Sequence, residues 1–112
     1  MPQHETVALK LAQMLIPKRD DDGNLFFLQA ARDLLAGVMT GFFLDRGEGS
    51  LRDVLTTIRT REGLRAALER HPQTRFLAEW YLPSEYIFGE IRATLTHELA
   101  YYEDIAGLSF RP

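Results

Sequence analysis

One apolar segment constrains the fold of this chain more than any other feature. Residues 25–44 read LFFLQAARDLLAGVMTGFFL and have the length of a membrane-spanning helix. Gln29, Arg32 and Asp33 lie near the middle of this segment. Each ionisable side chain there costs about 2.5–3.5 kcal/mol on insertion scales. We therefore expect a helix buried in a protein core, without membrane contact.

Helical periodicity also dominates the rest of the chain, and no run alternates apolar and polar residues as a half-buried strand does. We expect an all-α fold in which five or six helices surround the central apolar helix, about residues 25–44. The chain has 112 residues and is 46% hydrophobic, which is enough to bury a core without a disulfide or a metal. The predicted helices cover about residues 5–16, 25–44, 51–59, 61–70, 72–82 and 85–105, in a single domain over residues 1–112.

Capping patterns mark the predicted helix starts. Ser50, with Asp53 three residues later, matches a capping box, and Asn24, Thr60 and Ser84 are further N-cap candidates.

The second half of the chain also carries turn and burial signals. Pro72 suits the first turn of the helix that follows it, and the buried side of that helix is expected to include Phe76, Leu77 and Trp80. Gly107 suits a left-handed C-cap, and residues 108–110 are expected to be extended.

Small residues form a stripe on the central helix that would let a neighbouring backbone approach closely. They are Ala36, Gly37, Thr40 and Gly41.

The sequence contains no complete motif for catalysis, cofactor binding or metal binding. The chain has no cysteine and no GxxxxGK[ST] or GxGxxG loop, which excludes thiol chemistry and the usual phosphate cradles. Residues 20–24 resemble a calcium loop, but their glycine is misplaced and the distal glutamate is missing. His97 and Glu98 open like a zinc-binding HExxH helix, but Tyr101 replaces the second histidine. We expect no enzyme activity, no cofactor and no metal.

Charge is unevenly distributed along the chain. Residues 46–75 carry seven arginines against four acids, a net of +3, whereas residues 76–112 carry two arginines against six acids, a net of −4. Arginine donates paired hydrogen bonds to phosphates and carboxylates, which favours recognition of an anionic partner. The candidate contact residues are Arg52, Arg59, Arg61 and Arg65. The alternative is a solvated helix face with local ion pairs such as Glu62 with Arg65.

Three segments resemble one known family. Residues 27–37, FLQAARDLLAG, resemble the FxxxARxLLxG helix of type IV secretion coupling proteins, the TraG/TraD-type DNA-translocating ATPases. Residues 50–54, SLRDV, are similar to the short helix that follows it in that family. Residues 91–95, IRATL, with Leu99, are similar to the late SxRxTLxxxL helix, although Glu90 stands where a serine or small residue is common.

The resemblance implies the all-α domain that is inserted in the RecA-like motor of these proteins. Such a domain faces the cytoplasm and recognises a relaxosome (a DNA–relaxase complex) or secreted effector proteins. Its other partner is the motor domain of its own parent chain, which hydrolyses ATP, and no small-molecule substrate is implied. An inserted domain is also expected to bring its two ends close together.

Two other functions are compatible with the sequence. The first is a free-standing DNA-binding regulator that uses the two short arginine-bearing helices as a helix-turn-helix. The second is an adaptor that binds a helix of another protein through exposed rings at Trp80 and Tyr81, if these rings are not part of the core.

Overall fold

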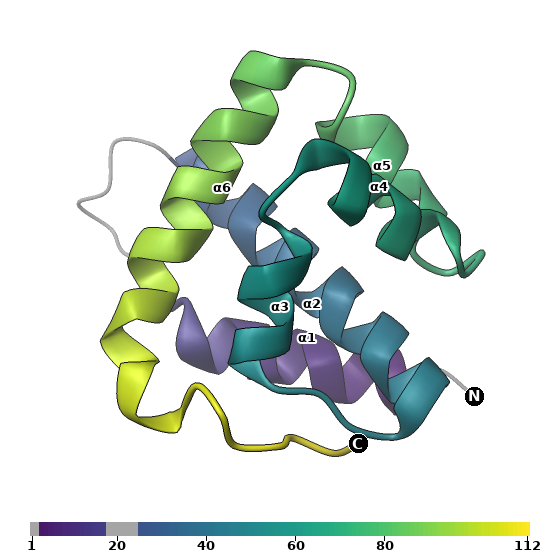
Figure 1. Cartoon of the computed structure of the whole chain (residues 1–112), viewed down its shortest axis with the longest axis vertical. Coiled ribbons are helices and arrows are strands. Elements are labelled where there is room, and N and C mark those ends of the chain that lie inside the picture. Colours follow the sequence, from purple (N-terminus) through teal and green to yellow (C-terminus); the bar gives the residue numbers. More distant parts are fainter. Residues whose placement is uncertain (1–2, 18–24) are drawn as a thin grey trace.

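Six α-helices and one 3-10 helix make up the computed structural model, which describes residues 3–17 and 25–112 (Figure 1). Their bounds are α1 Gln3–Leu15, α2 Leu25–Arg46, α3 Leu51–Thr57, α4 Arg61–Glu69, α5 Arg75–Tyr81, α6 Glu85–Leu99 and η1 Ala100–Ile105. Among the described residues, the only β pairing is an isolated bridge between Gly49 and Phe110. The predicted all-α fold is confirmed.

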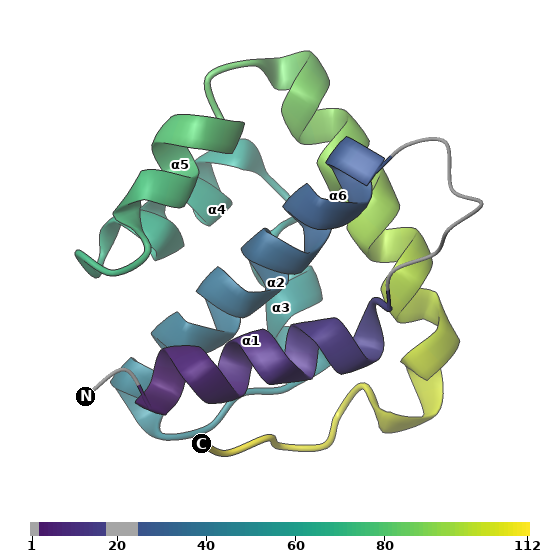
Figure 2. The same ribbon diagram turned by 180° about the vertical axis from the view of Figure 1, so that it is seen from behind.

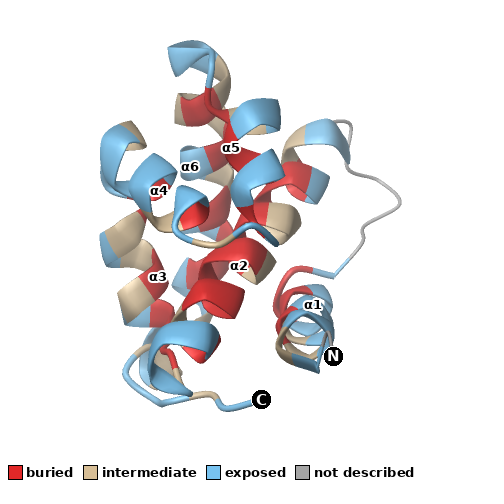
Figure 3. Cartoon of the chain, turned by 90° about the vertical axis from the view of Figure 1, so that its right-hand side faces the viewer, coloured by how far each residue is buried: buried red, intermediate tan, exposed pale blue. Residues whose placement is uncertain are grey.

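The central helix is α2, which contacts each of the other five α-helices. Helices α3 and α4 lie on one side of it (Figure 1), and α1 and α5 lie on the other (Figure 2). Among the described helices, α2 alone has the length and apolarity of a membrane span. Figure 3 shows that much of it is buried, and Leu34, Leu35, Met39 and Phe43 are almost fully enclosed. The apolar segment therefore forms the hydrophobic core in this structure.

The polar residues in the middle of α2 join it to neighbouring helices. The Arg32 guanidinium donates to the backbone carbonyl of Ile16, just beyond the end of α1. The Tyr81 hydroxyl, at the end of α5, donates to the Asp33 carboxylate over 2.7 Å, and Gln29 donates to the same carboxylate over 3.0 Å. These hydrogen bonds satisfy polar groups that an apolar environment would penalise.

The predicted N-caps that fall on described residues are all formed. The Ser50 hydroxyl accepts from the Asp53 N–H over 3.1 Å, and the Asp53 carboxylate accepts from the Ser50 N–H over 3.0 Å, which completes the capping box. Thr60 and Ser84 accept from the N–H groups three residues later. Asn24 and the acidic run at residues 20–24 lie outside the described residues.

Helix α5 departs most from the prediction. It begins at Arg75 instead of Pro72, because the buried Thr74 hydroxyl donates to the Leu68 carbonyl over 2.7 Å and holds residues 71–74 in a turn. The predicted buried side is right for Leu77 but wrong for Phe76 and Trp80, which are 41% and 65% exposed. Leu77 and Ala78 face the core instead. The other helix bounds agree with the predictions to within two residues, with η1 completing the last predicted helix.

Glycine positions also refine the sequence predictions. A Cβ at Gly37 would lie 2.4 Å from Leu77 Cδ1, so a close approach occurs there, but a side chain makes it and the prediction of a neighbouring backbone is wrong at this position. Gly107 does not adopt the expected left-handed conformation. Among the described residues only Gly47, just after α2, has a positive φ, 76°. Gly107 instead leaves room for the Arg52 guanidinium, which a Cβ would approach to 3.0 Å.

Both ends of the described chain pack against the C-terminal end of α2 and the loop after it (Figure 2). The ring of His4, in α1, lies 6.4 Å from that of Phe43. Phe110 and Gly49 exchange backbone hydrogen bonds of 2.7 and 3.0 Å, and Arg111 pairs with Glu48 at 3.0 Å. The two ends of the described chain therefore lie close together, as predicted, and the insertion itself stays a prediction.

Candidate recognition groove

A groove with a volume of about 800 Å³ lies between α2, α3 and α4. Val38 and Phe42 of α2 line it on one side, and Ala66 and Ala67 of α4 line it on the other. Gly63 adds no side chain, so this part of α4 is flat. The groove therefore combines apolar lining with space for a segment of a partner molecule.

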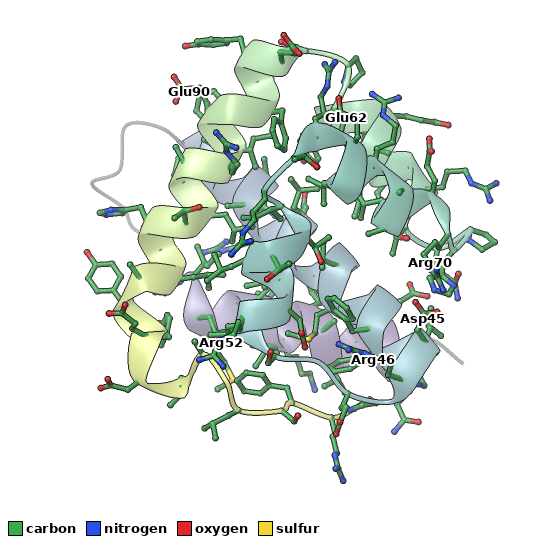
Figure 4. All side chains as sticks on the ribbon, in the orientation of Figure 1. Asp45, Arg46, Arg52, Glu62, Arg70 and Glu90 are labelled. Atoms are coloured by element: carbon green, nitrogen blue, oxygen red, sulfur yellow. The ribbon has the colours of Figure 1, made fainter. Side chains whose placement is uncertain are left out.

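Three arginines, Arg46, Arg59 and Arg70, also line this groove, which we call the arginine groove. Figure 4 shows Arg46 at the C-terminal end of α2 and the Arg70 and Asp45 side chains beside each other. Arg70 Nε lies 3.2 Å from the Asp45 carboxylate. Asp45 is the only acidic lining residue among those described, so the lining carries excess positive charge.

Two of these arginines are fixed by neighbours. Arg46 lies over the Phe42 ring, 4.5 Å from its centroid, and pairs with Asp53 at 2.9 Å. Arg70 shares Asp45 with His71, whose Nε2 is 2.9 Å from the carboxylate. The exposed Arg59 side chain makes no ion pair with any described residue and is the arginine most available to an anionic ligand.

Both carboxylates that hold the arginines remain ionised. Desolvation raises the pKa of Asp45, but the hydrogen bond and charge of Arg70, assisted by His71, outweigh it and place the pKa below its ordinary value. Desolvation likewise raises the pKa of Asp53. Hydrogen bonds from Ser50 and the charge of Arg46 outweigh this effect, so the pKa lies below its ordinary value. The ion pairs of Arg46 and Arg70 therefore persist at neutral pH.

A second groove, of about 680 Å³, lies between α3 and α6 and shares Arg59 with the first. Leu55, Ile58 and Ala93 contribute its apolar lining. Arg92 of α6 donates to the Arg59 carbonyl over 2.8 Å, and its guanidinium lies 5.5 Å from the Phe88 ring centroid. Arg59 therefore lies between two grooves, each of which is also lined by at least one other arginine.

The four predicted contact residues do not form one patch. Arg59 lines the grooves, whereas Arg52 lies beside Gly107 at the start of α3. Arg61 and Arg65 both donate to the Leu82 carbonyl, each over 3.4 Å, and so bind the C-terminal end of α5. Arg61 also lies 3.5 Å from the Glu85 carboxylate, at the start of α6.

Sequence reasoning missed three groove residues, Arg46, Arg70 and Arg92. Arg46 and Arg70 belong to the positively charged stretch, but only the packing of α2 against α4 brings them to one groove. The ion pair between Glu62 and Arg65, which belonged to the alternative of a solvated helix face, is not formed, because Arg65 turns toward Leu82. Glu62 lies at the start of α4 (Figure 4) and is in none of the ion pairs between described residues.

No three metal-ligating side chains come together among the residues that the structure describes. The incomplete HExxH pattern has a packing role: the His97 ring meets the edge of Tyr101, with centroids 5.8 Å apart.

Comparison with protein-family models gives no match, and comparisons with curated proteins and with solved structures also give none.

Proposed function

We propose that this chain is a non-catalytic recognition domain that binds an anionic segment of its partner in the arginine groove. The observation that carries this proposal is the combination of apolar lining with Arg46, Arg59 and Arg70 around one open groove. Apolar surface supplies affinity, and arginines select phosphate or carboxylate groups. Arg59 is the principal contact because no described carboxylate neutralises it.

We further propose that the domain is the all-α domain of a type IV secretion coupling protein. The support is the motif at residues 27–37, whose first characteristic position, Phe27, packs partly buried against the core. The other characteristic positions also have structural roles in α2. Ala31, Leu34 and Leu35 are buried. Arg32 binds the end of α1, and Gly37 admits Leu77 of α5. The motif therefore describes the residues that hold this helical domain together.

In this proposal the domain recruits a DNA–relaxase complex or a secreted effector protein on the cytoplasmic side of a membrane-anchored motor. ATP hydrolysis belongs to the motor domain of the parent chain. The residue pattern of the late helix fits the same scheme. Ile91, Leu95 and Leu99 are buried, and Arg92 ties α6 to the end of α3.

The helix-turn-helix alternative receives less support. Its second helix would be α4, but the two α4 arginines that could reach base edges, Arg61 and Arg65, are directed at the Leu82 carbonyl. A strong preference for one duplex sequence would nevertheless favour a regulator, because specific binding commonly exceeds nonspecific binding by about a thousandfold or more.

The binding proposal is tested with two anionic probes, a labelled oligonucleotide of mixed sequence and a labelled glutamate-rich peptide, titrated at several salt concentrations. We expect weak binding of at least one probe that falls as salt rises. Arg59→Ala should weaken it about threefold to tenfold and, for the oligonucleotide, reduce the salt slope by about one.

Arg75→Ala is the matched control, because Arg75 is an exposed arginine outside the groove with no ion pair to a described residue. Both variants should keep the helical circular-dichroism signal of the parent. If neither probe binds at low salt, or if the two variants weaken binding equally, the arginine groove is not the recognition site.

The family assignment has a separate test, the reading frame that encodes these residues. A phosphate-binding GxxxxGK[ST] loop in the same polypeptide supports it. A reading frame without any motor motif contradicts it and leaves the binding proposal untouched.

A further inference from the structure

A run of aromatic rings, exposed at Phe26, Phe76 and Trp80 and half-buried at Tyr81, lies on the side of α2 opposite the arginine groove. We call Phe26, Phe76, Trp80 and Tyr81 the aromatic face. The Phe76 and Trp80 centroids are 4.8 Å apart, those of Trp80 and Tyr81 6.3 Å, and those of Tyr81 and Phe26 6.1 Å. Trp80 is 65% exposed and Phe26 54% exposed. Contiguous exposed apolar surface of this kind marks an interaction site more often than isolated exposed residues do.

The aromatic face borders a groove of about 260 Å³ between α1, α2 and α5. Leu9 of α1, itself 43% exposed, forms one wall, and Phe76 and Trp80 form the other. Ala36, on α2, lies between these walls. Figures 2 and 3 show α1 and α5 flanking α2 on this side. A groove between two helices, with a third beneath, has the shape that accepts another helix.

The charged lining residues of this groove are both acidic, Glu5 and Asp33. Glu5 is exposed and makes no ion pair with any described residue. The Asp33 carboxylate is held in place by the Tyr81 hydroxyl and by Gln29. No described lysine or arginine lines the groove. A partner that fills it gains from carrying positive charge beside its apolar side chains.

We infer that this groove docks a basic amphipathic helix, with apolar side chains against Leu9, Phe76 and Trp80 and a lysine or arginine near Glu5 and Asp33. A second copy of this chain in a symmetric contact would bring two acidic grooves together, with no described lysine or arginine in the lining of either to neutralise them. An anionic membrane surface would be repelled by them. The site uses the face of α2 opposite the arginine groove, so it extends beyond the proposed function and does not depend on it.

Trp80 is the only tryptophan of the chain and reports directly on this groove. The probe is a leucine–lysine amphipathic helix of about 18 residues, or five turns. Its matched control is the same peptide with glutamate in place of lysine. The lysine peptide should shift Trp80 emission to shorter wavelength and protect Trp80 from acrylamide quenching. The glutamate peptide should do neither.

Two substitutions locate the binding. Glu5→Lys should weaken the lysine peptide about fivefold at low salt, through reversal of a single charge. Glu103→Lys makes the same net charge change on η1, at an exposed residue without a described ion pair, and should leave the affinity unchanged. Leu9→Ser should also weaken binding, and because Leu9 is exposed the variant should keep its circular-dichroism signal.

The inference is overturned by equal binding of both peptides, by the absence of a Trp80 response to either, or by equal losses in Glu5→Lys and Glu103→Lys. Sedimentation of the peptide-free protein supplies a further check. A dimer in which Trp80 is already protected from quenching would assign the groove to a second copy. Binding that survives Leu9→Ser unchanged would place the peptide elsewhere.

Discussion

At the residue scale, Asp53 shows how one side chain joins several elements. Its carboxylate accepts from the Ser50 N–H at the start of α3 and also pairs with Arg46 at the end of α2. The loop between these helices is therefore closed by a cap and an ion pair that share one carboxylate. The positive φ of Gly47 allows the chain to turn within this short connection.

The lowered pKa of Asp53 makes a prediction about acid stability. Desolvation raises the pKa of Asp53, but hydrogen bonds from Ser50 and the charge of Arg46 lower it more. The pKa of Asp53 in the folded state therefore lies below its ordinary value. The folded state then binds this proton less tightly than the unfolded state does. The stabilisation is complete above the unfolded pKa and is lost as the pH falls through the folded pKa.

Asp53→Asn should therefore lower the free energy of unfolding by about 1 kcal/mol at neutral pH and by much less near pH 3. Urea unfolding of both proteins across this pH range measures the difference. Glu103→Gln, an exposed change without a described partner, should show no such pH dependence. A constant difference between Asp53→Asn and the parent would contradict this role for the ionised carboxylate.

At the element scale, helix starts that depend on neighbouring residues could be predicted from the sequence, whereas features that depend on contacts between helices could not. Ser50, Thr60 and Ser84 cap helices through atoms only three residues away, so the sequence reveals these helix starts. The start of α5 depends on a bond from Thr74 to the Leu68 carbonyl, which belongs to another helix. A helix of seven residues has fewer than two complete turns, so its periodicity does not identify which side is buried.

The same distinction applies to the candidate site. The excess of arginine in residues 46–75 includes all three arginines of the groove, and Arg59, one of the four predicted contact residues, is among them. The charge pattern could not distinguish Arg59 from Arg61 and Arg65. Arg61 and Arg65 are occupied by hydrogen bonds to the Leu82 carbonyl, and Arg59 is not. That carbonyl comes from α5, about twenty residues later in the chain.

Substitution by alanine is expected to have opposite effects on the free energy of unfolding at two helix glycines, Gly37 and Gly89. Gly37→Ala gains helix propensity, but its Cβ would force Leu77 to move within a packed core, and overpacking costs about 1–3 kcal/mol. We expect unfolding free energy to fall by about 1 kcal/mol. Gly89→Ala in α6 meets no atom within 4 Å and should raise it by about 0.5–1 kcal/mol. Thermal or urea unfolding measures both, and equal effects would contradict the close approach of α5 to α2.

At the scale of the whole molecule, the chain surrounds α2 and closes on itself. One continuous cluster of buried side chains includes residues from all six α-helices. The last residues return to the loop after α2, where Phe110 pairs with Gly49 and packs against this core. The C-terminal segment therefore contributes to the fold although it forms no helix.

Phe110→Ala tests this closure. The ring is only partly buried, so we expect a loss of about 1–2 kcal/mol in unfolding free energy, less than for a fully buried phenylalanine. Phe26→Ala removes an equal number of atoms from an exposed ring of the aromatic face and should cost less than half as much. Urea midpoints compare the two variants. A larger loss for Phe26→Ala would show that the C-terminal segment is not part of the cooperative unit.

The burial of α2 has a consequence for the life of the newly made chain. Until the other helices cover it, this 22-residue segment presents to chaperones, translocation machinery and lipid a surface that resembles a membrane anchor. The segment is synthesised before α3, α4, α5 and α6 exist to cover it. Variants that slow assembly of the core should therefore be lost to aggregation or mistargeting in cells, even where the purified protein remains folded.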